Sequence, residues 1–125
     1  MRRSKCMKVL FLALLITAYL KNSDAATHQV GETNGWGFSV SYTDWANEKS
    51  FAAGDTLVFN YPASAHNVVP VKIAGYRSCK ALPSDMTKAQ ATGNDKFTLK
   101  KGANYFICSY AGHCSSGMKI QVNAT

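Results

Sequence analysis

Residues 105 to 121 read Tyr-Phe-Ile-Cys-Ser-Tyr-Ala-Gly-His-Cys-Ser-Ser-Gly-Met-Lys-Ile-Gln. This stretch holds a thiol at Cys108, an imidazole at His113 and a thioether at Met118, each five residues after the last. Apolar residues alternate before and after it, so a short loop between two strands can aim all three side chains at one point. A thiolate, an imidazole and a weakly binding thioether are ligand types that suit copper.

A fourth ligand is available upstream at His66, which stands between a turn and an apolar extended segment. A sandwich of sheets can bring that loop beside the loop from Cys108 to Met118. Two imidazoles, a thiolate and a thioether are the ligand set of a blue-copper electron-transfer site. Zinc also accepts two histidines and a cysteine, but methionine is a poor partner for zinc. We assign no special role to His28, which lies near the start of the expected domain.

The same alternation predicts the fold. Leu57, Phe59 and Tyr61 share one face of a strand because they are spaced two apart. Similar segments recur along the chain with turn residues between them, and no long amphipathic helix interrupts them. We therefore expect an all-β fold, an antiparallel sandwich or barrel, with one or two short helices, one of them at residues 42–48. The strands are expected at residues 27–30, from Phe51, and at 56–61, 67–73, 88–91, 96–100, 103–108 and 118–123.

Strand parity indicates where the candidate ligands lie. Met118 has the parity of Ile120 and Val122, and Cys108 has the parity of Phe106. If these apolar residues face the core, both sulfur ligands stand at the ends of inward faces. We expect the metal site at one end of the sandwich, partly shielded from water, with His113 as the ligand at the solvent edge.

Residues 1 to 25 read as a secretory signal rather than as part of the domain at 26–125. A basic start is followed by an apolar run of twelve residues, from Val9 to Leu20, and by the small residues Ser23 and Ala25. This pattern predicts cleavage after Ala25. The alternative is a membrane anchor, but such an anchor takes about 20 apolar residues. We expect the product to be secreted, with no membrane anchor.

Removal of the signal changes the charge of the chain. It takes away five of the 14 Lys and Arg and one of the seven Asp and Glu, which leaves a net charge of +3 instead of +7. The remaining bases are scattered apart from Lys100 and Lys101, whereas a nucleic-acid-binding protein would cluster them. We expect no nucleic-acid partner. The mild positive charge favours a modest affinity for acidic extracellular polymers.

The expected mature domain has three cysteines: Cys79, Cys108 and Cys114. In an oxidising compartment an odd number indicates one disulfide and one thiol with another use. If Cys108 binds a metal, the remaining pair is Cys79 with Cys114. That disulfide would close a loop of about 35 residues, which stabilises a fold by roughly 3–4 kcal/mol in the chain-entropy description.

The chain resembles the phytocyanins, plant blue copper proteins of the cupredoxin fold, over essentially all of residues 26–125. Within that family it is most similar to the plantacyanins, or basic blue proteins. Three stretches carry the resemblance, namely Phe-Ala-Ala-Gly-Asp-Thr-Leu-Val-Phe-Asn-Tyr at 51–61, His-Asn-Val-Val at 66–69, and Tyr-Phe-Ile-Cys through Gly-His-Cys-Ser-Ser-Gly-Met-Lys-Ile at 105–120.

The resemblance implies a Greek-key, two-sheet sandwich of the cupredoxin type, one copper ion, a disulfide and a supporting residue. The implied copper ligands are His66, Cys108, His113 and Met118, the implied disulfide is Cys79–Cys114, and Asn67 would restrain the thiolate. Met118 favours the plantacyanin branch, because a stellacyanin would have glutamine there. Ala111 and Pro70 depart from the family pattern without removing a ligand.

The functional expectation is a monomeric type 1 (blue) copper protein that carries single electrons between redox partners, protein or small molecule, in the apoplast or cell wall. It is not expected to be an enzyme. A copper oxidase would need several more histidines, and only His28 is unassigned, so the histidine count argues against an oxidase. A cysteine hydrolase that uses Cys108 and His113 is also disfavoured, because a disulfide and a methionine would crowd the pair. The alternative is a cell-wall signalling or interaction protein, for example in plant reproduction, in which copper is structural or incidental.

Overall fold

A computed structural model of the protein describes residues 24–125. The expected secretory signal therefore lies outside the described residues, apart from its last two positions. No helix between residues 24 and 125 has the length and apolar character needed to cross a membrane.

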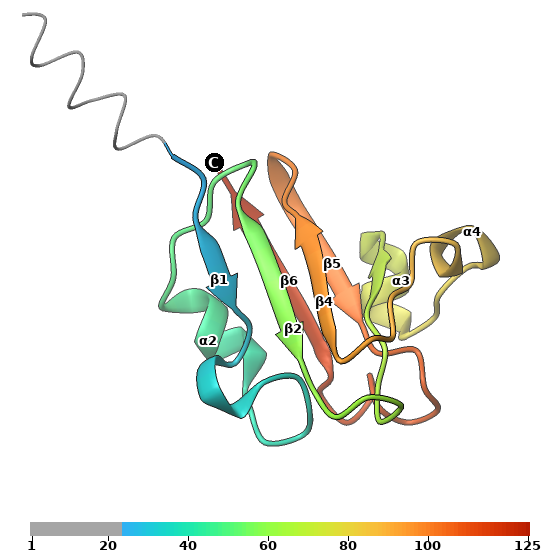
Figure 1. Ribbon diagram of the computed structural model, residues 1–125. Coiled ribbons are helices and arrows are strands. Elements are labelled where there is room, and N and C mark those ends of the chain that lie inside the picture. Colours follow the sequence, from blue (N-terminus) through green and yellow to red (C-terminus); the bar gives the residue numbers. More distant parts are fainter. Residues whose placement is uncertain (1–23) are drawn as a thin grey trace, which may run out of the picture.

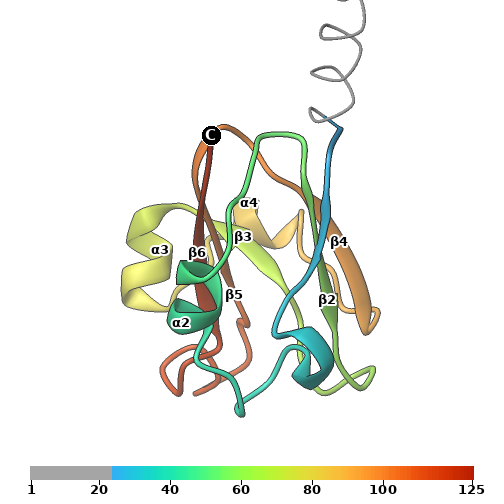
Figure 2. The ribbon, with the colours of Figure 1, turned by 90° about the vertical axis from the view of Figure 1, so that its left-hand side faces the viewer.

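Two three-stranded sheets pack face to face, as the sequence predicted (Figure 1). One sheet has the order β1-β2-β4, and the other has the order β3-β5-β6. Seen edge-on in Figure 2, the two sheets form separate layers. The strands are β1 (Thr27–Gln29), β2 (Thr56–Asn60), β3 (Val69–Val71), β4 (Asn94–Thr98), β5 (Gly102–Ile107) and β6 (Lys119–Ala124).

Alternation along the strands produces the core between the sheets. Leu57 and Phe59 of β2 are fully buried, while their neighbours on the strand are half-buried. Ile120 and Val122 of β6 face the same core from the opposite sheet. Each large apolar side chain buried in this way contributes about 1.5–3 kcal/mol relative to an exposed one. Both tryptophans are also in this core, and Trp36 packs edge-on against Phe59 at 5.0 Å.

The sheet β3-β5-β6 is covered on its outer side as well. Val69 and Ile107 are fully buried there in a second apolar cluster with Cys114. The helices α3 (Ile73–Ser78) and α4 (Pro83–Met86) lie over this side, while α2 (Tyr42–Asn47) packs against β6. A 3-10 turn, η1 (Glu32–Asn34), follows β1. Because β5 is covered on both faces, the segment that leads to Cys108 is held firmly in place.

Four details of the structure differ from the expectation. β1 and β2 are parallel, so the sheets are not purely antiparallel. The described residues hold three α-helices rather than one or two. Segment 67–73 shortens to β3, since the chain turns into α3 at Ile73. The expected strands at Phe51 and at 88–91 are reduced to single bridges, Phe51 with Ala124 and Gln90 with Val68.

Pro70 is accommodated because β3 is at the edge of its sheet. It stands opposite Phe106 on β5, and its outer side faces no further strand. A proline has no backbone N–H to donate, so an edge position is where a sheet tolerates it.

Candidate metal centre

Loops from both sheets meet at one end of the sandwich, the lower end in Figure 1. β2 leads into the loop that carries His66, and β5 leads into the loop that carries Cys108 and His113. The structure brings one donor atom of each of these three residues within 4.8 Å of the others. We call His66, Cys108 and His113 the donor cluster.

The distances within the donor cluster suit a single metal ion. Nδ1 of His66 lies 3.0 Å from Nδ1 of His113, and Sγ of Cys108 lies 3.5 Å from the same His113 nitrogen. Two nitrogens that bind one ion at about 2.0 Å stand roughly 3 Å apart. Cys108 is the free cysteine of the described chain, and it is fully buried. A buried thiol facing two imidazole nitrogens is the donor set that a soft, redox-active metal prefers.

Met118 closes the loop directly beside the donor cluster. The Cys108 N–H donates to the Met118 carbonyl at 3.0 Å, and the Met118 N–H donates to the His113 carbonyl at 3.1 Å. The Met118 side chain is fully buried and belongs to the same core cluster as Cys108. As the parity argument expected, the two sulfur side chains both point inward at the end of their strands.

Burial and the neighbouring His113 favour the neutral form of His66. His66 is 8% exposed, and burial, followed by the nearby His113, lowers the pKa of His66. His113 is half-buried and is the more accessible of the two imidazoles. Neutral imidazole is the form that binds metals.

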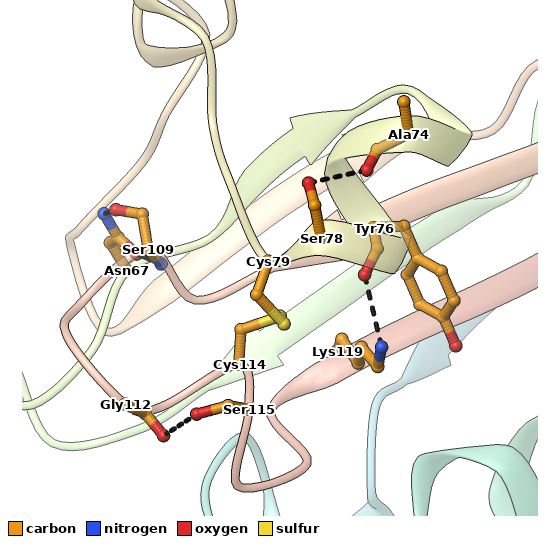
Figure 3. Close-up of a disulfide and its surroundings, with 10 residues drawn as sticks. All are labelled: Asn67, Ala74, Tyr76, Ser78, Cys79, Ser109, Gly112, Cys114, Ser115 and Lys119. Carbon is orange, nitrogen blue, oxygen red and sulfur yellow. Dashed lines mark hydrogen bonds between the residues drawn. A yellow bond between two sulfur atoms is a disulfide. The ribbon is translucent and has the colours of Figure 1, made fainter.

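Asn67 joins the two ligand-bearing loops. Its side-chain NH₂ donates to Ser109 Oγ at 2.7 Å, and its Oδ1 accepts the Ser109 N–H at 2.8 Å (Figure 3). Its carbonyl accepts the indole N–H of Trp36 at 3.0 Å. Asn67 is 4% exposed, and its bond to Trp36 is fully buried, while its two bonds to Ser109 are partly buried. The residue after His66 is thereby tied to the residue after Cys108.

Replacing Asn67 with alanine should lower the free energy of unfolding of the metal-free protein by about 1–3 kcal/mol, because it removes two hydrogen bonds and leaves the half-buried Ser109 N–H without its partner. Urea unfolding of the two proteins measures the difference. Asn123→Ala, at an exposed position of β6, is the control and should change stability by less than about 0.5 kcal/mol. Equal stability of Asn67→Ala and wild type would show that the link between the loops contributes nothing.

The disulfide Cys79–Cys114 anchors the same loop from its other side (Figure 3). It joins the end of α3 to the residue after His113. Cys79 has a positive φ of 55°, so the chain turns sharply at the end of α3, where the Cys79 sulfur meets that of Cys114. Lys119 adds a contact nearby, since its ammonium donates to the Tyr76 carbonyl at 3.2 Å and lies over the Tyr76 ring.

Phe38 is a part of this end that sequence reasoning missed. It is 57% exposed, and its ring lies 4.8 Å from the His113 ring and 5.5 Å from the His66 ring. Tyr42 supports the loop that carries Phe38, because its hydroxyl accepts the Gly37 N–H and donates to the Gly35 carbonyl. Burial raises the pKa of Tyr42 to about 12, so the hydroxyl keeps its proton. An exposed aromatic after a glycine-rich turn was the available signal.

The comparisons with known proteins agree with the geometry. The plastocyanin-like domain family matches residues 36–118. A basic blue protein of Cucumis sativus is 46% identical over 99 residues, which cover 79% of this chain and 99% of that protein. Chemocyanin of Lilium longiflorum is 42% identical over 120 residues, covering 94% of this chain and 92% of the relative.

Solved structures give the same result. The structure of cucumber basic protein, a blue copper protein, superposes with a TM-score of 0.73 at 44% identity and covers 79% of this chain and 99% of its own. Cucumber stellacyanin superposes with a TM-score of 0.74 at 34% identity, covering 82% and 96%. The chain belongs to the phytocyanins, the blue copper proteins of the cupredoxin fold. Its cofactor is one copper ion.

Proposed function

We propose that this copper protein is a secreted carrier of single electrons, with copper held by His66, Cys108, His113 and Met118. The observation that supports it most directly is the convergence of three donor atoms within 4.8 Å from residues up to 47 positions apart. Met118 completes the set as a weak axial ligand, which is the arrangement found in blue-copper electron-transfer sites.

The chain's own residues would keep the site in one shape. Copper, when bound, supplies a one-electron couple between its two oxidation states. The Asn67–Ser109 bonds and the disulfide hold the two ligand loops at fixed positions, and the core around Cys108 excludes water. A frame that does not move when charge changes needs little rearrangement at each transfer, and such preorganisation speeds the step.

Electrons would enter and leave at His113. Phe38 and Tyr110 are exposed and pack beside the His113 ring, with ring separations of 4.8 Å and 5.6 Å. Together they form a small apolar rim around the most accessible ligand, which a redox partner can approach closely. Apolar and aromatic contacts of this kind are typical of the centres of protein interfaces.

Secretion and a non-enzymatic role are the other parts of the proposal. The signal pattern of residues 1–25 supports export, and the disulfide Cys79–Cys114 fits an oxidising compartment. His28 is the histidine outside the site. It lies on β1, away from the donor cluster, and its Nε2 is 2.9 Å from Oδ2 of Asp55. A carrier with a single copper ion therefore fits better than a multicopper oxidase.

Adding Cu(II) to the protein that starts at Ala26 tests the proposal. We expect one equivalent of copper to produce an intense blue absorption band and the EPR signal of a thiolate-bound Cu(II) centre, and a reductant to bleach the band reversibly. A colourless complex, or a colour that a reductant does not bleach, would contradict an electron-carrying role.

Met118→Gln tests the axial ligand. We expect the blue band to persist while the reduction potential falls by at least about 60 mV, which is a tenfold change in a one-electron equilibrium constant. Protein-film voltammetry measures the shift. Met86→Gln is the control, since Met86 is 42% exposed on α4. A potential equal to that of the wild type in Met118→Gln would exclude Met118 as a ligand.

A second candidate function, binding of an acidic cell-wall polymer, is favoured by a groove along β3, β4 and β5. The groove has a volume of about 500 Å³, and its lining includes the aromatic residues Phe97, Tyr105 and Phe106. Three lysines line it: Lys72, Lys88 and Lys100. None of the three is in an ion pair within residues 24–125. The single carboxylate of the lining, Asp85, accepts the Leu82 N–H instead.

Removing the groove charges should weaken binding to polygalacturonate, a polymer of acidic sugars. We expect Lys72→Gln with Lys88→Gln and Lys100→Gln to bind about tenfold more weakly at low salt, with the difference shrinking as salt screens the charges. Biolayer interferometry on the immobilised polymer measures it. The matched control removes three exposed charges outside the groove, at Arg77, Lys80 and Lys101. An equal loss in both triple variants would indicate attraction by net charge alone and contradict a binding groove.

A further inference from the structure

Asp55 is a buried carboxylate directly before β2, and β2 begins at the end of the sandwich away from the ligand loops (Figure 1). It is 4% exposed. Burying a carboxylate is costly unless its oxygens are hydrogen-bonded. Three donors meet this need: the Ala26 N–H at 2.9 Å from Oδ1, and the Ala52 N–H at 3.0 Å and His28 Nε2 at 2.9 Å from Oδ2.

The net effect of these contacts on Asp55 favours the charged form. Burial raises the pKa of Asp55, but the hydrogen bonds from His28, Ala26 and Ala52 outweigh it and leave the pKa below its ordinary value of 3.8. A carboxylate held ionised beside a backbone nitrogen is able to receive a positive charge on that nitrogen. Of the three donors, Ala26 is the one whose nitrogen can become charged by processing.

Ala26 is the residue that follows the predicted signal. Hydrolysis of the Ala25–Ala26 peptide bond by a signal peptidase consumes one water molecule and breaks the C–N bond. The carboxylate stays on Ala25, and the amino group of Ala26 takes up a proton to become an ammonium. The nitrogen that now donates to Asp55 as an amide would then be the first atom of the mature chain.

We propose that Asp55 is the receptor for the amino terminus created by this cut, and that the Ala26 ammonium pairs with the Asp55 carboxylate in the mature protein. The inference rests on the proposed secretion, because that provides the cut. The pair would fasten the first strand to the second. The Ala26 carbonyl already accepts the Thr56 N–H at 2.9 Å, and Thr27 stands opposite Thr56 in the parallel register.

The proposal predicts that the charge on the Ala26 nitrogen affects the stability of the fold. An ammonium keeps the N–H donor of the amide and adds a positive charge about 3 Å from Asp55. One extra residue before Ala26 keeps the N–H but moves the charge about 3.5 Å further along the chain. Acetylation of Ala26 keeps the N–H and removes the charge altogether. These three forms therefore separate the effect of charge from the effect of the hydrogen bond.

The test compares the melting temperatures of three copper-free proteins: one that starts at Ala26, one with a single glycine before Ala26, and one acetylated at Ala26. We expect the glycine-extended and acetylated forms to melt roughly 5 °C lower at pH 6.5. In an Asp55→Asn background this difference should disappear. Glu48→Gln, an exposed carboxylate at the end of α2, is the matched control and should preserve the difference.

The pH dependence is a readout that a purely structural role would not move. An ammonium paired with a carboxylate has a raised pKa, so its stabilisation is complete below the ordinary value of about 7.7–8.0 and is lost as the pH rises through the raised value. The difference between the Ala26-start and acetylated forms should therefore vanish at high pH. His28 contacts the same carboxylate, so the comparison is repeated in a His28→Gln background, where the difference should still vanish at high pH. If Asp55→Asn does not fold, NMR titration of the Ala26 amino group still tests the pairing.

The outcomes distinguish this inference from the proposed secretion. If the protein exported from plant cells starts at Ala26 and the three forms differ as stated, the pairing is supported. Equal melting temperatures, or an amino pKa at or below its ordinary value, would overturn the pairing while leaving secretion intact. A chain that is exported but begins at another residue would overturn the cut at Ala25 and the pairing with it.

Discussion

Replacing Cys108 with serine should abolish the blue absorption band and weaken copper binding by more than about 100-fold, beyond the 10–100-fold typical of losing a residue that only supports a ligand. The colour of such centres depends on a thiolate bound to copper, and Cys108 is the one cysteine between residues 24 and 125 that is outside the disulfide. His66 and His113 would remain, so weak and colourless copper binding is expected. Copper titration followed by visible absorption and EPR measures both effects.

The control for Cys108→Ser must show that the fold survives. Serine places a hydroxyl in a fully buried position, which costs about 1–3 kcal/mol if it lacks a partner. Cys108→Ala avoids the buried hydroxyl and should give the same loss of colour. Circular dichroism should show an unchanged fold in both variants. A blue band that persisted in either folded variant would rule out Cys108 as the copper ligand.

Removing the disulfide with Cys79→Ala and Cys114→Ala should lower the free energy of unfolding by about 3–4 kcal/mol, since the disulfide closes a loop of 35 residues. Cys114 is also buried against Val69 and Ile107, so the variant loses some packing in addition. Copper should dissociate faster, because Cys114 adjoins His113 and the disulfide restrains that loop. Denaturant unfolding and the transfer of copper to a chelator measure the two effects.

Reduction of the wild-type disulfide separates the cross-link from the packing. The reduced protein keeps both sulfur atoms, so its loss of stability reports the cross-link alone, and the further loss in the double alanine variant reports the packing. A reduced protein as stable as the oxidised one would show that the disulfide does not stabilise the fold.

Local patterns account for the parts of the site that could be predicted. Period-two alternation predicted that Leu57 and Phe59 face the core and that Met118 points inward with Ile120 and Val122. Such patterns concern residues a few positions apart, whose relative directions follow from strand geometry alone. The same repetition of short strands predicted an antiparallel sandwich or barrel.

Contacts between distant segments account for the parts that sequence reasoning missed. Phe38 reaches the donor cluster from a loop near the start of the domain, and the glycine-rich turn before it does not indicate which distant residues it contacts. His28 was expected to have no special role, yet its side chain forms a hydrogen bond with Asp55 where the parallel strands β1 and β2 pair. That pairing brings together residues 27 positions apart, and its direction depends on how the first strand packs on the finished sandwich.

The sequence alone specifies the kinds of ligand and the cysteine pairing that is possible. The residue types from Cys108 to Met118 indicate a soft metal, and the odd number of cysteines in the expected mature domain indicates a single disulfide. Only the stacking of the two sheets brings Nδ1 of His66 to 3.0 Å from Nδ1 of His113, 47 residues away in the chain. The same stacking lets Asn67 form a hydrogen bond with Ser109. Strand geometry can be deduced locally, whereas the meeting of loops at one end of a sandwich depends on the packing of the whole core. That packing brings the separate donors together as a candidate copper site.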